Sequence, residues 1–121
     1  LFGRRRHFPG IQSSAPFIRA QAERMAINAP VQGTAADVMR IAMNEVYAYV
    51  KKGKKTDSIH MLMQVHDELI FEIRTEDVEK EAKKLQKIME GVLEGKDESG
   101  VPILADVATG PNWAELQEVP K

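Results

Sequence analysis

The stretch that decides the fold is residues 59–74, which read IHMLMQVHDELIFEIR. Apolar and polar side chains alternate before and after the polar triplet at its centre, and a period of two is typical of β-strands. The alternating apolar residues are Ile59, Met61, Met63, Val65, Leu69, Phe71 and Ile73. Because few polar residues separate the two runs, we predict a tight antiparallel β-hairpin over residues 59–74, with Asp67 near its tip.

The tip of this hairpin has an unusual sequence, His66-Asp67-Glu68. It lacks the Asn-Gly or Asp-Gly pair that two-residue turns commonly use. A carboxylate held at a turn that suits its sequence poorly is a candidate functional site. The alternative is that Asp67 is simply a common turn residue. The hairpin alone leaves both interpretations open.

Composition is typical of a soluble globular protein, because 43% of the 121 residues are hydrophobic and 29% are charged. The chain has no cysteine, which excludes a disulfide framework and a thiolate metal site. No apolar run approaches the length of a membrane span, so we expect a cytoplasmic location and no membrane partner. Because the sequence starts at Leu1 rather than Met, we expect a processed product or part of a longer protein.

The net charge of −1 hides an asymmetry along the chain. Residues 1–24 contain five arginines and one acid, whereas residues 67–99 contain six basic and eleven acidic residues. Arginine binds phosphate well, so Arg4, Arg5 and Arg6 are candidates for contacts with a polyanion. The alternative is a solvated basic tail.

Residues 16–52 have apolar side chains at helical spacing, with one interruption. Pro30 lacks a backbone N–H and disfavours the helical conformation of the residue before it. We therefore predict one long helix that is broken or kinked near Pro30. Residues 1–15 predict a basic loop with at most one short strand, and Ser13 or Ser14 is the expected helix cap.

The last part of the chain predicts one more helix and one more strand. Residues 75–94 form an amphipathic helical pattern, with Thr75 as the expected N-cap. Within the final segment, residues 101–121, we predict an edge strand over 101–109 followed by a tail, with Trp113 as a packing anchor. The expected fold is therefore α+β, with the hairpin and a further strand packed on long helices.

A second candidate site lies on the long helix. Arg24, Asn28 and Gln32 are four residues apart, so a helix places them on one face. Every base pair presents an acceptor in the DNA minor groove, and donors on such a face would test base-pair geometry without reading sequence. The alternative is that these side chains bond to backbone groups freed by Pro30.

Three blocks of the sequence together resemble the C-terminal end of the bacterial family A DNA polymerases, the DNA polymerase I type. They are LFGRRR (residues 1–6), AERMAINAPVQGTAAD (residues 22–37) and QVHDEL (residues 64–69). The blocks occur in the family's order, and the similarity continues to GPNW (residues 110–113). The Glu68 that follows His-Asp resembles the DNA polymerases rather than the related single-subunit RNA polymerases.

The resemblance implies that the whole chain is the C-terminal part of a polymerase palm, which performs template-directed nucleotidyl transfer during DNA replication or repair. It implies that Asp67 is one of two carboxylates that hold two Mg²⁺ ions, that Glu68 supports Asp67, and that His66 helps to place the primer terminus. The implied partners are primer-template DNA and deoxynucleoside triphosphates. The implied DNA contacts are Arg24, Asn28, Gln32, Arg4, Arg5 and Arg6.

Two parts of the family's site do not occur in this sequence. They are the Asp-Tyr-Ser motif, which carries the other metal-binding aspartate, and the Tyr-Gly of the fingers helix that grips the triphosphate. We therefore expect the chain alone to be inactive and to need an upstream segment with thumb, fingers and the first catalytic aspartate. The alternative is a non-catalytic DNA-binding or subunit-interaction module that retains the palm fold. A metal hydrolase is disfavoured, because no further carboxylate has a suitable spacing from Asp67 and Glu68.

Overall fold

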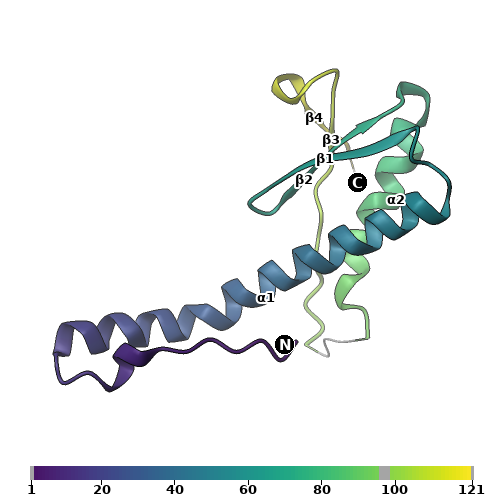
Figure 1. Ribbon diagram of the computed structural model, residues 1–121. Coiled ribbons are helices and arrows are strands. Elements are labelled where there is room, and N and C mark those ends of the chain that lie inside the picture. Colours follow the sequence, from purple (N-terminus) through teal and green to yellow (C-terminus); the bar gives the residue numbers. More distant parts are fainter. Residues whose placement is uncertain (1, 96–98, 121) are drawn as a thin grey trace. The chain divides into compact units, whose positions relative to one another are not determined.

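A computed structural model describes residues 2–95 and 99–120 (Figure 1). Within these two ranges, two α-helices and two antiparallel strand pairs confirm the predicted α+β class. The chain divides into two compact units, Leu1–Arg40 and Ile41–Lys121. The helices and strands are α1 (Pro16–Lys52), β1 (Ile59–Val65), β2 (Glu68–Ile73), α2 (Val78–Glu90), β3 (Ala108–Thr109) and β4 (Gln117–Glu118).

Helix α1 is a continuous helix of 37 residues, so the predicted break near Pro30 is wrong (Figure 1). A proline inside a helix removes one backbone hydrogen bond and costs about 3 kcal/mol. Turns on both sides stay hydrogen-bonded, because helix growth is cooperative once a helix is nucleated. Near the start of α1, the Ser13 Oγ accepts a hydrogen bond from the Ala15 N–H at 3.2 Å, so one of the two expected capping serines lies at this helix end.

The first unit consists of an N-terminal loop (residues 2–8), a 3₁₀ turn (Pro9–Gln12) and the first part of α1. Within residues 2–15 there is no strand, and the predicted loop contains this 3₁₀ turn instead. Gly10 lies against α1, and a Cβ placed on it would be 3.2 Å from the Cγ2 of Ile18 and 3.5 Å from the Cβ of Ala22. A residue larger than glycine at position 10 would therefore crowd the side chains of the helix.

The second unit has a small apolar core. Its buried side chains come from the end of α1, from β1, from α2 and from the turn after α2. They are Ala42, Val46, Val50, Ile59, Ala82, Leu85 and Val92. Burying one such aliphatic side chain contributes about 1.5–3 kcal/mol, so this core stabilises the hairpin together with both helices.

The region after the hairpin is helical, but its start differs from the prediction. Thr75–Asp77 forms a 3₁₀ turn, α2 begins at Val78, and Gly91–Leu93 is again 3₁₀. Thr75 does not cap α2, because the extra turn moves the helix start and places Asp77 at the N-cap position. The side chain of Asp77 makes no cap hydrogen bond.

The last segment also differs from the prediction. The strand pair β3–β4 is separate from the hairpin sheet, and residues 101–107 form no strand. The Ala105 N–H donates to Glu90 at 3.0 Å and the Ala105 carbonyl accepts from Gln86 at 2.7 Å, so side chains of α2 satisfy the backbone that a strand ladder would otherwise bond. Trp113 is 55% exposed, so its predicted role as a packing anchor is wrong.

Glu81 is a buried carboxylate in the second unit, with 2% of its surface exposed. It accepts hydrogen bonds from Lys55 Nζ at 2.5 Å and from the Tyr49 hydroxyl at 2.7 Å. Burial by itself raises the pKa of Glu81, but these two hydrogen bonds and the charges of Lys55 and Lys84 outweigh it, so the pKa of this carboxyl lies below its ordinary value.

Replacing Glu81 by Gln is expected to lower the free energy of unfolding at pH 7 by about 2 kcal/mol, because Lys55 loses a charged acceptor. The depressed pKa of Glu81 gives stability that is fully present above the unfolded pKa of about 4.3 and is lost as the pH falls through the folded value. Urea unfolding at pH 7, 5 and 3 should therefore show that the difference in unfolding free energy between the wild type and Glu81→Gln shrinks below pH 5. The control is the exposed Glu79→Gln, and an equal effect of both substitutions would contradict the role of Glu81.

Candidate functional site

The candidate turn lies where β1 and β2 meet. Val65 pairs with Glu68, which leaves His66 and Asp67 as a two-residue turn and confirms the predicted hairpin. His66 has φ 51°, in the left-handed region that costs a residue with a Cβ about 1 kcal/mol. The Gln64 side-chain amide donates to the His66 carbonyl at 2.6 Å and so fixes this conformation from the neighbouring strand.

Strand β1 contains one irregularity. Met61 pairs with Phe71. The next pair joins Met63 to Ile70, so Leu62 has no partner in the ladder. A residue inserted in this way forms a β-bulge, which increases the local twist and re-aims the residues beyond it. The predicted alternation is therefore interrupted at Leu62, between the buried start of the hairpin and the turn.

The turn presents its charged groups to solvent. His66, Asp67 and Glu68 are all exposed. Carboxylate oxygens are the hard ligands that Mg²⁺ prefers, and Mg²⁺ usually takes only one or two of them from a protein. Among residues 2–95 and 99–120, no group of three or more His, Asp or Glu residues could hold a metal ion. Asp67 and Glu68 therefore fit part of a magnesium site, which needs further ligands.

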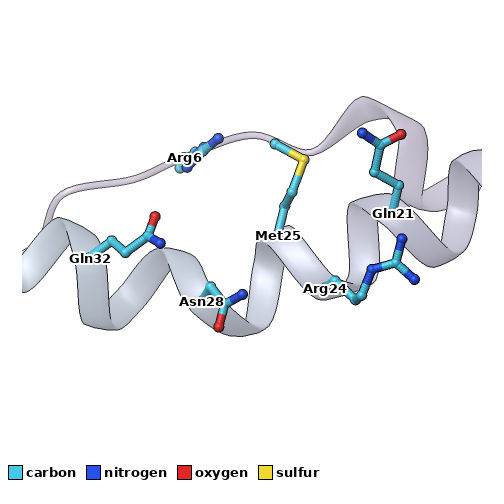
Figure 2. A pocket seen from close by; sticks show the side chains of 6 residues that line it. All are labelled: Arg6, Gln21, Arg24, Met25, Asn28 and Gln32. Atoms are coloured by element: carbon cyan, nitrogen blue, oxygen red, sulfur yellow. The ribbon is translucent and has the colours of Figure 1, made fainter.

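The second candidate site lies in the first unit. Arg24, Asn28 and Gln32, which were predicted to share one helix face, are exposed on α1. They line a concavity of about 430 Å³ together with Arg6, Gln21 and Met25 (Figure 2). The predicted alternative does not hold, because none of the three side chains bonds to the backbone within the part of the chain that the structure describes.

Figure 2 shows how the concavity is built. Gln21, Met25 and Gln32 rise from α1 toward the N-terminal loop, and Arg6 extends from that loop. The guanidinium of Arg6 lies 5.2 Å from the centroid of the Phe8 ring, a cation–π contact within the same loop. Sequence reasoning missed Gln21, although Gln21, Asn28 and Gln32 have the spacing that places residues on one helical face.

Arg4 differs from the other arginines of the loop, because it forms an ion pair with Asp37 of α1. Its Nε lies 2.9 Å and 3.0 Å from the two carboxylate oxygens, and its Nη2 lies 2.6 Å from Oδ1. These hydrogen bonds lower the pKa of the Asp37 carboxyl below its ordinary value, against the effect of burial. They also raise the pKa of Arg4. No local sequence pattern indicates this contact, which joins residues 33 positions apart.

Comparison with known proteins assigns this chain to a family. The family model for DNA polymerase family A matches residues 1–115 of the 121. The chain belongs to DNA polymerase family A. This family A chain is 45% identical over 115 residues to DNA polymerase I of Rhizobium leguminosarum. The match covers 95% of the chain and 11% of that protein.

Other family A proteins show the same relationship. Thermostable DNA polymerase I of Thermus filiformis is 44% identical over 118 residues, covering 98% of the chain and 13% of that protein. The solved polymerase domain of Pol1 from M. smegmatis, in complex with DNA primer-template and dNTP, has a TM-score of 0.66 and 37% identity. That match covers 74% of the chain and 16% of the solved one. The family A chain thus spans only 11–13% of these curated relatives.

Within residues 2–95 and 99–120, no helix of this family A chain combines the length and the apolar character needed to span a bilayer.

Proposed function

We propose that this chain is the C-terminal palm segment of a DNA-directed DNA polymerase that acts in DNA replication or repair. The observation that carries the proposal is the family match over residues 1–115 together with an exposed Asp67 on a two-residue turn. The M. smegmatis relative, solved with primer-template and dNTP, supports the same substrates here. Because the chain matches only 11–13% of its curated relatives, an upstream segment supplies the rest of the polymerase.

The reaction is nucleotidyl transfer. The 3′-hydroxyl oxygen of the primer forms a bond to the α-phosphorus of the incoming triphosphate, and the bond from that phosphorus to the pyrophosphate oxygen breaks. The proton of the hydroxyl leaves to solvent or to a base. When bound, two Mg²⁺ ions would lower the pKa of the attacking hydroxyl and neutralise charge on the pyrophosphate.

The turn residues have two roles, which are to hold the metal ions and to place the primer terminus. Asp67 supplies carboxylate oxygen to the metal site, and the adjacent Glu68 supports it. His66 helps to place the primer terminus, with its backbone fixed by the hydrogen bond from Gln64. A short turn between paired strands suits this task, because a site on a rigid element keeps its geometry better than a site on a long loop.

The helix face supplies contacts to DNA. Arg24 and Gln32 donate hydrogen bonds to minor-groove acceptors near the terminal base pair, and Asn28 on the same face adds another donor. Arginine in the N-terminal loop contributes the sequence-independent attraction to phosphate that dominates affinity for DNA.

A segment exchange tests the proposal. The 115 residues of R. leguminosarum DNA polymerase I that match this chain are replaced by the chain itself, and primer extension is measured. We expect the chimera to extend a primer in the presence of Mg²⁺. A chimera that folds and binds DNA but extends no primer would contradict a catalytic role.

The second candidate is a non-catalytic DNA-binding or subunit-interaction module. It is favoured by apolar side chains that are exposed on α1, where Ile27 is 75% and Val31 74% exposed. Such exposure is expected for a surface that contacts another polypeptide. The same surface serves equally to contact the rest of a polymerase. The two functions differ in Asp67, which is indispensable only in the catalytic one.

Replacing Gln32 by Ala should lower primer extension by the assembled polymerase about tenfold, since one hydrogen bond to the terminal base pair is lost. The assembled polymerase here means this chain together with its upstream segment. The Mg²⁺ dependence should stay the same, because Gln32 is not a metal ligand. The control is Gln12→Ala, an exposed glutamine outside the concavity. A changed metal requirement in Gln32→Ala would contradict the minor-groove role.

A further inference from the structure

We infer that Arg4 is a positioning residue, whose ion pair with Asp37 fixes the N-terminal loop on α1 so that Arg6 contacts the phosphate backbone of DNA at the concavity. The inference rests on the proposed function, since it assumes that this chain binds primer-template. It assigns Arg4 and Arg6 different tasks, although they stand side by side in one basic run.

The ion pair has the geometry of an anchor. The Arg4 guanidinium bonds both oxygens of Asp37 through Nε and adds a third bond through Nη2. Asp37 is 8% exposed, so the carboxylate is buried, whereas the Arg4 side chain that bonds it is 57% exposed. Arginine–carboxylate pairs with several bonds fix orientation as well as distance, which a lysine or a single bond does not.

The ion pair also neutralises Arg4. A guanidinium matched to a carboxylate at hydrogen-bond distance adds little net charge for a phosphate to detect. Arg5 and Arg6 are exposed and form no ion pair within the described part of the chain. The charge that this loop presents to a polyanion therefore comes from Arg5 and Arg6.

The loop is fixed on both sides of Arg6. Arg4 bonds Asp37 on one side, and Gly10 lies close against Ile18 on the other. The five residues between these two fixed points have far fewer conformations than a free tail, and less entropy is lost when such a segment binds a ligand. Loss of the Arg4 anchor would return residues 2–8 to a loosely held tail.

The concavity has the chemistry that a DNA backbone requires. Its lining contains two cations, Arg6 from the loop and Arg24 from α1, and no acidic residue. The amides of Gln21, Asn28 and Gln32 supply further hydrogen-bond donors. Phosphate oxygens accept from Arg6, and minor-groove acceptors bond Arg24, Asn28 and Gln32 as proposed above, in both cases without regard to base sequence. A displacement of Arg6 would remove one of the two charges that face this space.

Replacing Asp37 by Asn is the decisive test, because the two possible roles of Arg4 predict opposite changes in the affinity for DNA. If Arg4 bonded phosphate directly, Asp37→Asn would release it and tighten DNA binding. If Arg4 positions Arg6, the same substitution weakens binding about fivefold to tenfold, the size of one charge-assisted contact, although it removes a negative charge. The dissociation constant for primer-template is measured by fluorescence anisotropy on the assembled polymerase at fixed ionic strength.

Two variants act as controls. Glu23→Gln changes the charge of α1 by the same amount at an exposed position, and it should bind DNA at least as tightly as the wild type. Exchange of the two partners, Arg4→Asp with Asp37→Arg, restores the ion pair and should return the dissociation constant to within about twofold of the wild type. A structural defect unrelated to the pair would not be rescued in this way.

A double-mutant comparison covers the case in which Asp37→Asn fails to fold. Arg4→Met and Arg6→Met are measured singly and together, and the double variant should bind no more weakly than Arg6→Met alone. Multiplied losses would mean two independent phosphate contacts and would overturn the inference, as would tighter or unchanged binding by Asp37→Asn. Wild-type protein that binds no primer-template would instead overturn the proposed function, and this inference with it.

Discussion

Asp67→Asn should reduce primer extension by the assembled polymerase at least ~1,000-fold, which corresponds to about 4 kcal/mol of lost transition-state stabilisation. The substitution keeps the shape and exposure of the turn but removes the anionic oxygen that we propose as a metal ligand. DNA binding should change little, because the DNA contacts proposed above lie elsewhere in the chain. Single-turnover extension of a labelled primer, with anisotropy on the same protein, separates the two effects.

Two further variants sharpen this prediction. Asp67→Glu keeps the charge but moves the carboxylate along the side chain, so a loss of roughly 100-fold is expected from misplacement alone. Asp57→Asn removes an exposed carboxylate from the turn that precedes β1, and it should extend primers like the wild type. Extension by Asp67→Asn within about tenfold of the wild type would exclude Asp67 from the chemistry.

The isolated chain should extend no primer above a protein-free control, whereas adding the upstream segment should produce extension. The physical reason is the incomplete ligand set, because the described residues contain no group of three that could hold a metal ion. One carboxylate cannot place two metal ions between a primer hydroxyl and a triphosphate. The measurement is extension of a labelled primer by the chain, by the upstream segment and by their mixture.

Contamination is the main hazard of that experiment, and Asp67→Asn controls for it. Activity that appears in preparations of the isolated chain and persists in Asp67→Asn comes from a host polymerase. Activity of the isolated wild-type chain that disappears in Asp67→Asn would contradict the need for an upstream segment.

The hairpin was predictable because it depends on local features. Alternation over residues 59–74 and the short polar separation predicted both strands and the position of Asp67, and the structure confirms them. The bulge at Leu62 was not predictable, since a register shift depends on how facing side chains pack across the strands rather than on either strand alone. The turn places His66 in the left-handed conformation that usually favours glycine, and the hydrogen bond from Gln64 helps to hold it there.

The long helix shows where a local rule fails. Pro30 predicted a break, yet the helix continues, because the cooperative bonding of many turns exceeds the cost of one missing bond. In the C-terminal segment, apolar residues at 101–109 favoured a strand. The side chains of Gln86 and Glu90 on α2 bond to its backbone instead, and a local sequence pattern does not indicate these partners.

The two candidate sites differ in how much the sequence revealed. The shared face of Arg24, Asn28 and Gln32 follows from helical spacing, and in the structure these three residues line one concavity. The presence of Arg6 beside them, and the pairing of Arg4 with Asp37, depend on a contact between residues 33 positions apart. Such contacts are set by tertiary structure, so the division of tasks within the basic run became visible only in three dimensions.

The most direct test of the central claim counts metal ions rather than reaction products. Mn²⁺, a paramagnetic substitute for Mg²⁺, is titrated into the assembled polymerase with primer-template and a non-reactive triphosphate, and free Mn²⁺ is followed by electron paramagnetic resonance. Loss of an outer partner of a metal ligand already weakens binding about tenfold or more, so Asp67→Asn should weaken Mn²⁺ binding at least that much. Equal Mn²⁺ affinity in wild type and Asp67→Asn would contradict the assignment of Asp67 as a metal ligand.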